Sequence, residues 1–578
     1  MEKRVLLAIF LSFLVLVAYQ SLMPPPPEPQ TARPSGKPSQ APSTGAKPTS
    51  PPAPVAPAAP STFAQPLVAG DAERDVVVET PMVAATFNTR EAVLKSWRLK
   101  RYNDGAGQPL ELVPHDLPAD AERVFALTLL DQQDSALVAR AIFRPSVQAL
   151  EVTKDPQTIA FEYRDASGLG VTKSFTFDPA QPYVVSFTVR AERSGKSLDP
   201  VVHLGAMGPA GHSGSSTSYV APARAIIAKD GDVERIGVKD LAKPEKAVHN
   251  GVFPFAGADE HYFISALIRP EEQLRVEYRP VTGSTTGDQP ARQLVAYSAR
   301  FAAAPSNKRL FLGPKDFDQL QAVDPFFVRA IDFGMFRILV VPLLNALKWI
   351  NAWAGNYGLS IITLTVLINA AMFPLRHKSV VSMRKMQEIQ PEVKAIQDRY
   401  AKLKMSDPAR QKMNVELMNL YREKGANPAS GCIPMLLTFP VLIAFYSLLS
   451  VAIELRGAPF AGWIRDLSQP DPLYITPILM GVTMVWQQKL TPMTTADPVQ
   501  QKMMMFMPVM FTVFFLWAPS GLVLYWFVSN VWAIGQQLVT NRIIGPPRVH
   551  AVRPAAERRV KRVGGSKTDQ AESGGRAS

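Results

Sequence analysis

The residues whose types could support covalent catalysis lie in a glycine-rich stretch from Gly205 to Gly214 and just beyond it. From Gly211 to Ser215 the sequence is Gly-His-Ser-Gly-Ser, which is close to the nucleophile elbow of serine hydrolases. That motif ends in a second glycine, and Ser215 occupies this place here. The stretch also lacks the Lys-Ser/Thr ending of a phosphate-binding loop. We therefore assign no catalytic residue and expect no nucleotide hydrolysis.

Histidine and cysteine are the next candidates, because they could bind metals or do redox chemistry. His203, His212, His249 and His261 are scattered without the spacing of metal ligands, so core or surface positions explain them better. Cys432 is the one cysteine of the chain, which excludes an intramolecular disulfide, a cysteine-based metal cluster and an amino-terminal lipobox. We expect no metal site and no cofactor.

Uncharged polar residues inside strongly apolar segments form a third group. Thr365 and Asn369 are four residues apart, so they share one face of a helix. Similar residues in other apolar segments are Thr438, Thr483, Gln487, Ser529, Asn530, Gln536 and Gln537, of which the last four mark one side of their segment. They fit either hydrogen bonding between helices or a hydrated groove that shelters a passing polypeptide. These segments hold no Asp or Glu, which argues against ion-coupled transport.

Six apolar segments are candidates for membrane-spanning helices. Val5–Met23, after Lys3 and Arg4, is expected to be an uncleaved signal anchor, because no A-x-A pattern closes it and four prolines follow. The other five are Tyr357–Leu375, Cys432–Ile453, Tyr474–Gln488, Met503–Trp517 and Leu522–Leu538. Several are shorter than the ~20 residues that cross an ordinary bilayer, so we expect a locally thinned membrane.

The charge of the connecting segments predicts the orientation. Residues 376–431 hold twelve Lys/Arg against six Asp/Glu, and the tail 541–578 holds nine against three. The connection 454–473 has two basic residues, and 489–502 joins the fourth and fifth spans. Placing the basic segments in the cytoplasm satisfies the positive-inside rule, with six spans and both termini cytoplasmic.

This topology places a large region outside the cytoplasm. A linker rich in proline and alanine, residues 24–62, leads into residues 63–335, where short β-type patterns alternate with turn signals. The clearest strand patterns are Tyr183–Arg190, Thr158–Tyr163, Lys173–Phe177 and Leu274–Tyr278. We expect an antiparallel β-sandwich. The segment 336–353, apolar but carrying Arg337 and Lys348, is expected to be an amphipathic helix in the membrane interface.

The segment 376–431 predicts a basic helical hairpin in the cytoplasm. Met383, Met386, Val393 and Ile396 repeat at helical spacing, and Asp407-Pro408 offers a helix start. The hairpin either orients the protein by its charge or forms a docking surface for a ribosome or an emerging chain. Its candidate docking residues are Arg384, Lys385, Lys394 and Arg399.

Several blocks of the carboxyl-terminal part, in this order, resemble a known family. They are Asn427-Pro428 with Gly431-Cys432, PFAGWIRDLSQPDPLYITPILMG at 459–481, DPVQQKMMMFMPVMFTVFFLW at 497–517, and PSGLVLYWFVSN at 519–530. With the predicted topology, they resemble the YidC family of membrane-protein insertases, of the Gram-negative type with a large periplasmic domain.

The resemblance implies a polytopic α-helical protein of the bacterial inner membrane, with six spans, a five-helix insertase core and a periplasmic antiparallel β-sandwich. It implies that the chain is not an enzyme but inserts membrane proteins and assists their folding and assembly, alone or with the Sec translocon. A hydrophilic groove would carry the polar flank of an incoming segment across. Implied partners are newly made membrane proteins, lipid, Sec components and the ribosome, without sequence-specific binding of nucleic acid.

The resemblance adds to the candidate groove residues and shows one departure. The polar residues of the spans supply Thr365, Asn369, Thr438, Gln487, Ser529 and Asn530, and the resemblance adds Tyr525 and Trp526 as the family's aromatic pair. The family usually has an arginine where alignment on Met372–Leu375 places Asn369, which puts a charge-based mechanism in doubt. The alternatives are a transporter with a periplasmic solute-binding domain and a membrane-anchored carbohydrate-active domain.

Overall fold

The computed structural model describes residues 65–104, 106–118, 121–208, 222–284, 292–400, 409–425, 433–490 and 498–544. The chain divides into two units, Met1–Phe63 and Ala64–Ser578. The predicted signal anchor and most of the linker therefore lie outside the described residues, as do Asp407-Pro408 and the stretch from Gly211 to Ser215.

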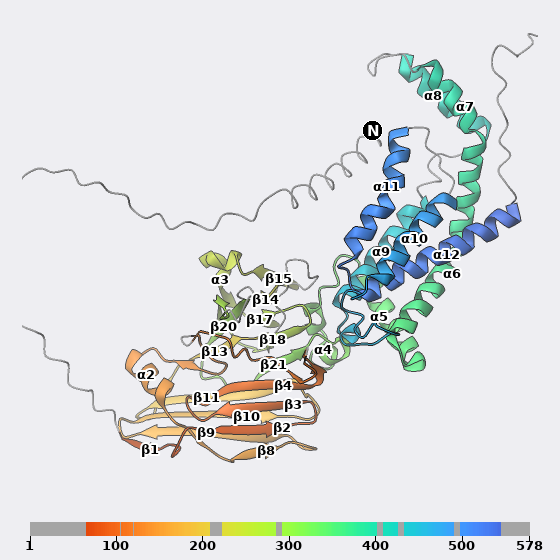
Figure 1. Cartoon of the computed structure of the whole chain (residues 1–578). Coiled ribbons are helices and arrows are strands. Elements are labelled where there is room, and N and C mark those ends of the chain that lie inside the picture. Colours follow the sequence, from red (N-terminus) through yellow and green to blue (C-terminus); the bar gives the residue numbers. More distant parts are fainter. Residues whose placement is uncertain are drawn as a thin grey trace, which may run out of the picture. The chain divides into compact units, whose positions relative to one another are not determined.

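The first part of the second unit is built from three β-sheets (Figure 1). Almost every strand pair is antiparallel, and the exception is the parallel pair of β2 and β8. The main path of the largest sheet contains, in spatial order, β1 (Pro66–Val68), β9 (Gln157–Asp165), β10 (Leu169–Phe177), β11 (Val184–Arg193), β21 (Lys308–Pro314), β18 (Phe263–Ile268), β17 (Phe255–Asp259), β14 (Arg224–Lys229) and β15 (Asp232–Gly237). Two short strands of the same sheet lie off this path: β12 (Lys196–Leu198) pairs with β11, and β7 (Arg144–Pro145) pairs with β9.

Two smaller sheets complete the β domain. One contains β16 (Val248–Gly251), β19 (Leu274–Thr282), β20 (Gln293–Phe301), β13 (Val201–Ala206) and β6 (Leu127–Thr128). The other contains β5 (Pro109–Glu111), β4 (Val93–Asn103), β3 (Val83–Asn88), β2 (Asp75–Glu79) and β8 (Ala149–Glu151). Short helices join the strands, namely α2 (Gln132–Arg140), η1 (Asp240–Ala242), α3 (Pro244–Ala247), α4 (Phe317–Val323) and η2 (Phe327–Ala330).

Aromatic side chains pack the sheets against each other. Residues along β10 alternate between buried and half-buried, because successive side chains of a strand point to opposite faces. Its Phe175 lies 4.6 Å, between ring centroids, from Phe87 on β3 and 4.6 Å from Phe125 in the segment before β6. All three rings are fully buried. The antiparallel sandwich is thus confirmed, and the four predicted strand patterns lie in β9, β10, β11 and β19.

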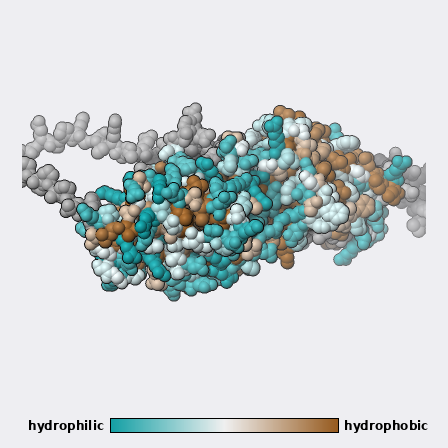
Figure 2. All heavy atoms as spheres, turned by 90° about the horizontal axis from the view of Figure 1, so that it is seen from below, coloured by the Kyte–Doolittle hydropathy of each residue, from teal (hydrophilic) through white to brown (hydrophobic). Residues whose placement is uncertain are grey.

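The helical part begins at residue 337. Its helices are α5 (Arg337–Ala354), α6 (Tyr357–Glu388), α7 (Gln390–Arg399), α8 (Ala409–Glu423), α9 (Ile433–Val451), η4 (Ile453–Leu455), α10 (Ile475–Leu490), α11 (Pro498–Phe515) and α12 (Ser520–Ile544). Within the described residues, two segments are long and apolar enough to cross a membrane, Tyr357–Ser382 and Ser520–Ile543; shorter apolar stretches are Pro440–Val451 and Met505–Phe515. Figure 2 shows hydrophobic side chains gathered over the helical part, whereas the β domain is mostly hydrophilic.

Helix α5 occupies the segment expected to lie in the membrane interface. Val340, Leu344 and Leu347 are buried on one face, while Trp349 and Trp353 are exposed. Lys348 pairs with Asp318 of α4, and its Nζ lies 3.7 Å from Glu454 Oε1. The helix is therefore amphipathic, as expected, and an ion pair ties it to the end of the β domain.

The predicted cytoplasmic hairpin consists of the end of α6 together with α7 and α8. Ile389 and Val393 form a small separate core with Met386, Leu417 and Leu420. Across the two helices, Lys424 pairs with Glu392 at 3.2 Å and Arg399 with Glu416 at 3.2 Å. The apolar stripe predicted from the sequence thus packs α7 against α8 and leaves the basic residues outside.

Candidate functional site

The polar residues of α6 form a chain of hydrogen bonds along one face. The Thr365 hydroxyl donates to the carbonyl of Ile361 at 2.6 Å, and Asn369 Nδ2 donates to the carbonyl of Thr365 at 2.8 Å. Thr365 has no exposed surface, and Asn369 is 3% exposed. The Thr365 hydroxyl therefore has no further hydrogen to donate, although its oxygen can still accept, and the Asn369 oxygen accepts from a residue further along the helix.

Arg376 is the functional candidate that sequence reasoning missed. Its Nη1 donates to Asn369 Oδ1 at 2.7 Å, so the guanidinium points back along α6. Sequence analysis counted Arg376 as the first basic residue of a cytoplasmic loop, but α6 continues without a break to Glu388. The sequence feature that could have revealed this contact is the spacing of seven residues between Asn369 and Arg376. Seven residues are nearly two helical turns, so both side chains lie on the same face of α6.

The aromatic pair at the start of α12 points in two directions. Tyr525 stacks on Phe445 of α9, with ring centroids 4.4 Å apart and planes 12° apart. Trp526 instead packs against Phe515 and Phe511 of α11, at 5.0 Å and 5.7 Å. Tyr525 therefore faces α9, and Trp526 faces α11.

The polar residues of α12 also divide between two faces, which corrects the expectation that they mark one side. Asn530 Nδ2 lies 3.4 Å from both Met480 O and Thr483 Oγ1 of α10, and Gln537 donates to Asn541 at 3.1 Å. A second face carries Tyr525, Ser529, Trp532, Gln536 and Thr540, which are three or four residues apart. Adjacent residues differ by about 100° around a helix, so Ser529 is turned by that angle from Asn530, which contacts α10.

Part of this second face is buried without hydrogen bonds. Trp532 Nε1, Gln536 Nε2 and Thr540 Oγ1 have no partner among the described residues. Helices α12 and α6 pack against each other (Figure 1). Buried polar atoms without a partner cost about 1–3 kcal/mol each, so water or a polar ligand is expected to bind them. We give the name polar seam to these residues of two helices in contact: Asn369 and Arg376 of α6, with Tyr525, Gln536 and Thr540 of α12.

The remaining predicted groove and hairpin residues lie elsewhere. Gln487 of α10 is half-buried and already has a partner, while the side chains of Thr438 and Arg384 are outside the described residues. On the hairpin, Lys385 and Lys394 are exposed, as is Arg399, which pairs with Glu416. The hairpin thus presents basic side chains to solvent.

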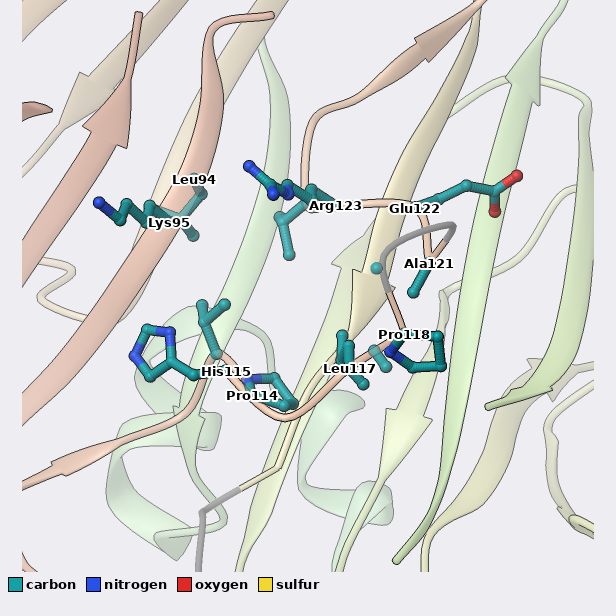
Figure 3. Close-up of a pocket in the computed structure, with 13 residues that line it drawn as sticks. Leu94, Lys95, Pro114, His115, Leu117, Pro118, Ala121, Glu122 and Arg123 are labelled. Carbon is teal, nitrogen blue, oxygen red and sulfur yellow. The ribbon is translucent and has the colours of Figure 1, made fainter. Parts of the chain in front are cut away.

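The β domain contains a pocket of about 190 Å³ between β4, β13 and the segment before β6 (Figure 3). Lys95, His115 and Arg123 stand near its mouth, and Pro114, Leu117 and Pro118 form an apolar wall. Glu122 points away from the pocket toward His203 Nδ1, 3.0 Å from its carboxylate. This hydrogen bond lowers the pKa of Glu122, against the opposing effect of its partial burial. Glu122 therefore contacts His203 and is not directed into the pocket.

The described histidines have separate structural partners. His203 Nε2 lies 2.7 Å from the Thr128 hydroxyl, and His249 Nε2 lies 3.0 Å from the carbonyl of Lys246. His261 Nε2 lies 2.8 Å from the carbonyl of Ser450, so it joins the β domain to the end of α9. Burial lowers the pKa of His261 to about 4, with a smaller contribution from Lys315. Among the described residues, no three His, Cys, Asp or Glu side chains gather as metal ligands.

Comparison with known proteins covers almost the whole chain. Residues 75–346 match the family model of the YidC periplasmic domain, and residues 349–546 match that of the 60Kd inner membrane protein. The membrane protein insertase YidC of Geobacter sulfurreducens is 38% identical over 94% of this chain and 99% of its own. The insertase of Syntrophus aciditrophicus is 34% identical over 94% of this chain and 100% of its own.

A solved structure is also similar to this chain over most of its length. The crystal structure of an active YidC insertase with its first transmembrane domain resolved is 18% identical to this chain. It covers 83% of this chain and 95% of that one, with a TM-score of 0.33. The full-length identity to the curated relatives carries the conclusion and confirms the resemblance found in the sequence: this chain belongs to the YidC family of membrane protein insertases.

Proposed function

We propose that this protein inserts integral membrane proteins into the bacterial inner membrane and assists their folding. Its relatives are named membrane protein insertases, and one structural observation supports the same activity for this chain. That observation is the polar seam, in which a guanidinium and unpaired polar atoms lie within a predominantly apolar helical bundle. Such groups are costly in hydrocarbon and are typical of a pathway for polar cargo.

The seam suggests how insertion proceeds. An incoming hydrophobic segment slides along the bundle, and its short polar flank passes the hydrated side chains of α6 and α12. Water and hydrogen-bonding groups raise the local dielectric constant, which lowers the cost of carrying polar peptide inward. Burial of the new apolar segment in lipid then drives the step. Tyr525 and Phe445 close the seam at the end where α12 begins.

Membrane topology is the second part of the proposal. The distribution of basic residues supports six spans with both termini in the cytoplasm and the β domain in the periplasm. Helices α9 and α10, of 19 and 16 residues, would be about 28 and 24 Å long. A bilayer core of about 30 Å must thin to match the shorter one, which shortens the path of the polar flank.

The hairpin supplies the contact with cytoplasmic partners. Val415 and Met418 of α8 are exposed apolar side chains, 59% and 48% exposed, near basic residues. Flexible methionine side chains suit partners of variable shape. We propose that this surface receives newly made membrane proteins, with the ribosome and the Sec translocon as further partners.

Reconstitution tests the function. Purified protein in liposomes is supplied with a small single-span client, and protease protection measures the inserted fraction. We expect insertion well above that of protein-free liposomes and of liposomes with an unrelated polytopic protein. Equal protection in all three would refute the proposed function.

A further inference from the structure

Helix α5 leaves an apolar stripe exposed on the side away from its buried face. Ile338 is 83% exposed, and Met335, just before the helix, is 86% exposed. Trp349 and Trp353 are exposed as well, and Trp349 lies on the side of Ile338 because eleven residues make about three helical turns. Tryptophan is enriched at the headgroup level of membranes. In the proposed topology this stripe meets the periplasmic leaflet.

The two cations of α5 lie on one flank of this stripe but differ in their partners. Arg337 and Lys348 are eleven residues apart, so they share one side of the helix. Lys348 pairs with Asp318, and its Nζ lies 3.7 Å from Glu454 Oε1. In the part of the chain that the structure describes, no carboxylate forms an ion pair with Arg337, which is half-buried. The charge of Arg337 is therefore open to a ligand.

Arg329 is a second cation without a carboxylate partner among the described residues. It is exposed at the end of η2, its Nη1 donates to the carbonyl of Gly231, and its guanidinium lies 4.7 Å from the centroid of the Phe326 ring. Burial lowers the pKa of Arg337, and the positive charge of nearby Arg329 lowers it further. Two like charges repel, so an anion that contacts both would be stabilised. We name Arg329 and Arg337 the arginine pair.

The carboxylates of the neighbouring β strands and of the segment before α5 already bind other cations. Asp259 is fully buried and accepts from Arg224 Nη2 at 2.9 Å and from Lys315 Nζ at 2.7 Å. Asp332 lies 3.9 Å from both Arg224 Nη1 and Arg235 Nε. Three cations thus share these two carboxylates, so neither is free to neutralise the arginine pair.

We propose that the arginine pair binds the phosphate of an anionic phospholipid in the periplasmic leaflet, with the acyl chains of the lipid against Met335 and Ile338. The inference goes beyond the proposed function and uses only its topology. Guanidinium groups bind phosphate oxygens through paired hydrogen bonds. A zwitterionic headgroup brings a cation of its own, which the pair repels, so the site prefers lipids with a net negative charge.

The bound lipid would tie the β domain, as well as α5, to the membrane surface. Arg235 of β15 donates through Nη2 to the carbonyls of Arg329 and Ala330, each at 3.0 Å. The backbone that carries Arg329 is therefore fixed to the β domain, whereas Arg337 belongs to α5. One phosphate that contacts both arginines bridges these two parts of the chain.

The test measures which lipids remain bound to the full-length protein. Purified protein in detergent is mixed with equal amounts of phosphatidylglycerol and phosphatidylcholine with the same acyl chains, and native mass spectrometry gives the ratio of the two bound lipids. The variants are Arg329→Gln, Arg337→Gln, the double variant and Ile338→Gln. Arg190→Gln, which removes an exposed arginine of β11, is the matched control. The apparent unfolding midpoint in detergent shows whether each variant folds.

We expect each single arginine variant to lower the ratio of bound phosphatidylglycerol to phosphatidylcholine about fivefold, and the double variant to lower it further. Arg190→Gln should leave the ratio unchanged, and Ile338→Gln should lower the retention of both lipids alike. Where a glutamine variant does not fold, the corresponding lysine variant, which keeps the charge but loses the paired hydrogen bonds, should still lower the ratio about twofold.

An unchanged ratio in the folded double variant would overturn the proposal, as would an equal loss with Arg190→Gln. Glycerol 3-phosphate, a soluble source of the same phosphate chemistry, is added in about hundredfold excess and should not displace the lipid, because it lacks the apolar chains. Displacement would show a site for a soluble phosphate and contradict the lipid site. Client insertion is measured separately, so its failure would refute the proposed function and leave the lipid preference standing.

Discussion

Arg376 donates a hydrogen bond of 2.7 Å to Asn369, across seven residues of one helix. The pair places a charge beside Asn369, the position at which the sequence alone predicted an uncharged residue in place of the family's usual arginine. Asn369 is uncharged, so it does not itself replace the family's usual arginine. It instead binds the charged side chain of Arg376.

Substitution of Asn369 tests this pairing. Asn369→Leu removes the acceptor, so the Arg376 guanidinium should move to the interface and leave the seam apolar. Asn369→Arg places a cation in the seam directly. We expect the leucine variant to insert clients about tenfold less well and the arginine variant to retain most activity, since hydrogen bonds to charged groups contribute about 1.5–3 kcal/mol. Complementation of a strain depleted of its own insertase measures both, and equal growth of the two would contradict the pairing.

The hairpin surface is tested by crosslinking. Photo-reactive amino acids at Val415 and Met418, which are exposed on α8, should capture a stalled nascent chain or a ribosomal protein. The same probe at Val393, buried between α7 and α8, serves as the control and should capture neither. If the exposed positions capture no more than Val393, the hairpin has only an orienting role.

A buried lysine gives the β domain a specific pH dependence. Lys173 is fully buried, and its Nζ donates to the carbonyls of Glu91 and Phe125 at 2.6 and 2.7 Å. Burial lowers its pKa from 10.5 to about 7, against the attraction of Glu91. The unfolded state therefore binds more protons between about pH 7 and 10.5, and this group's contribution to stability rises with pH over that range.

Lys173→Met removes that slope. We compare the apparent unfolding midpoints of the unaltered protein and the variant at pH 7 and pH 9.5. The midpoint of the unaltered protein minus that of the variant should increase by at least about 2–4 °C between these two pH values. Lys229→Met, at an exposed position on β14, is the control and should keep the slope. Parallel curves for the unaltered protein and Lys173→Met would show that Lys173 is not the titrating group.

The sequence predicts elements best where a single periodicity dominates. β9, β10 and β11 lie where β-branched and aromatic residues gather, and α5 buries the apolar face predicted for it. Two features could not be predicted. Helix α6 continues past the end of its apolar run and through Pro374, where a helix end would be expected, so Arg376 belongs to the helix and not to a loop. Asn530 faces α10 and not the seam. Which neighbour a residue of α12 contacts depends on how the helices pack in three dimensions, and the periodicity of α12 alone does not show it.

Water access to the polar seam is the most direct test of the account. Single cysteines are placed at Gln536 and Thr540, with Cys432 replaced by serine, and labelled from the cytoplasmic side with a membrane-impermeant maleimide. Leu448 of α9, which is fully buried, is the control. We predict rapid labelling at positions 536 and 540, protection by a stalled client, and slow labelling at 448. Labelling at 536 and 540 as slow as at 448 would show a dry, sealed bundle and contradict a hydrated pathway.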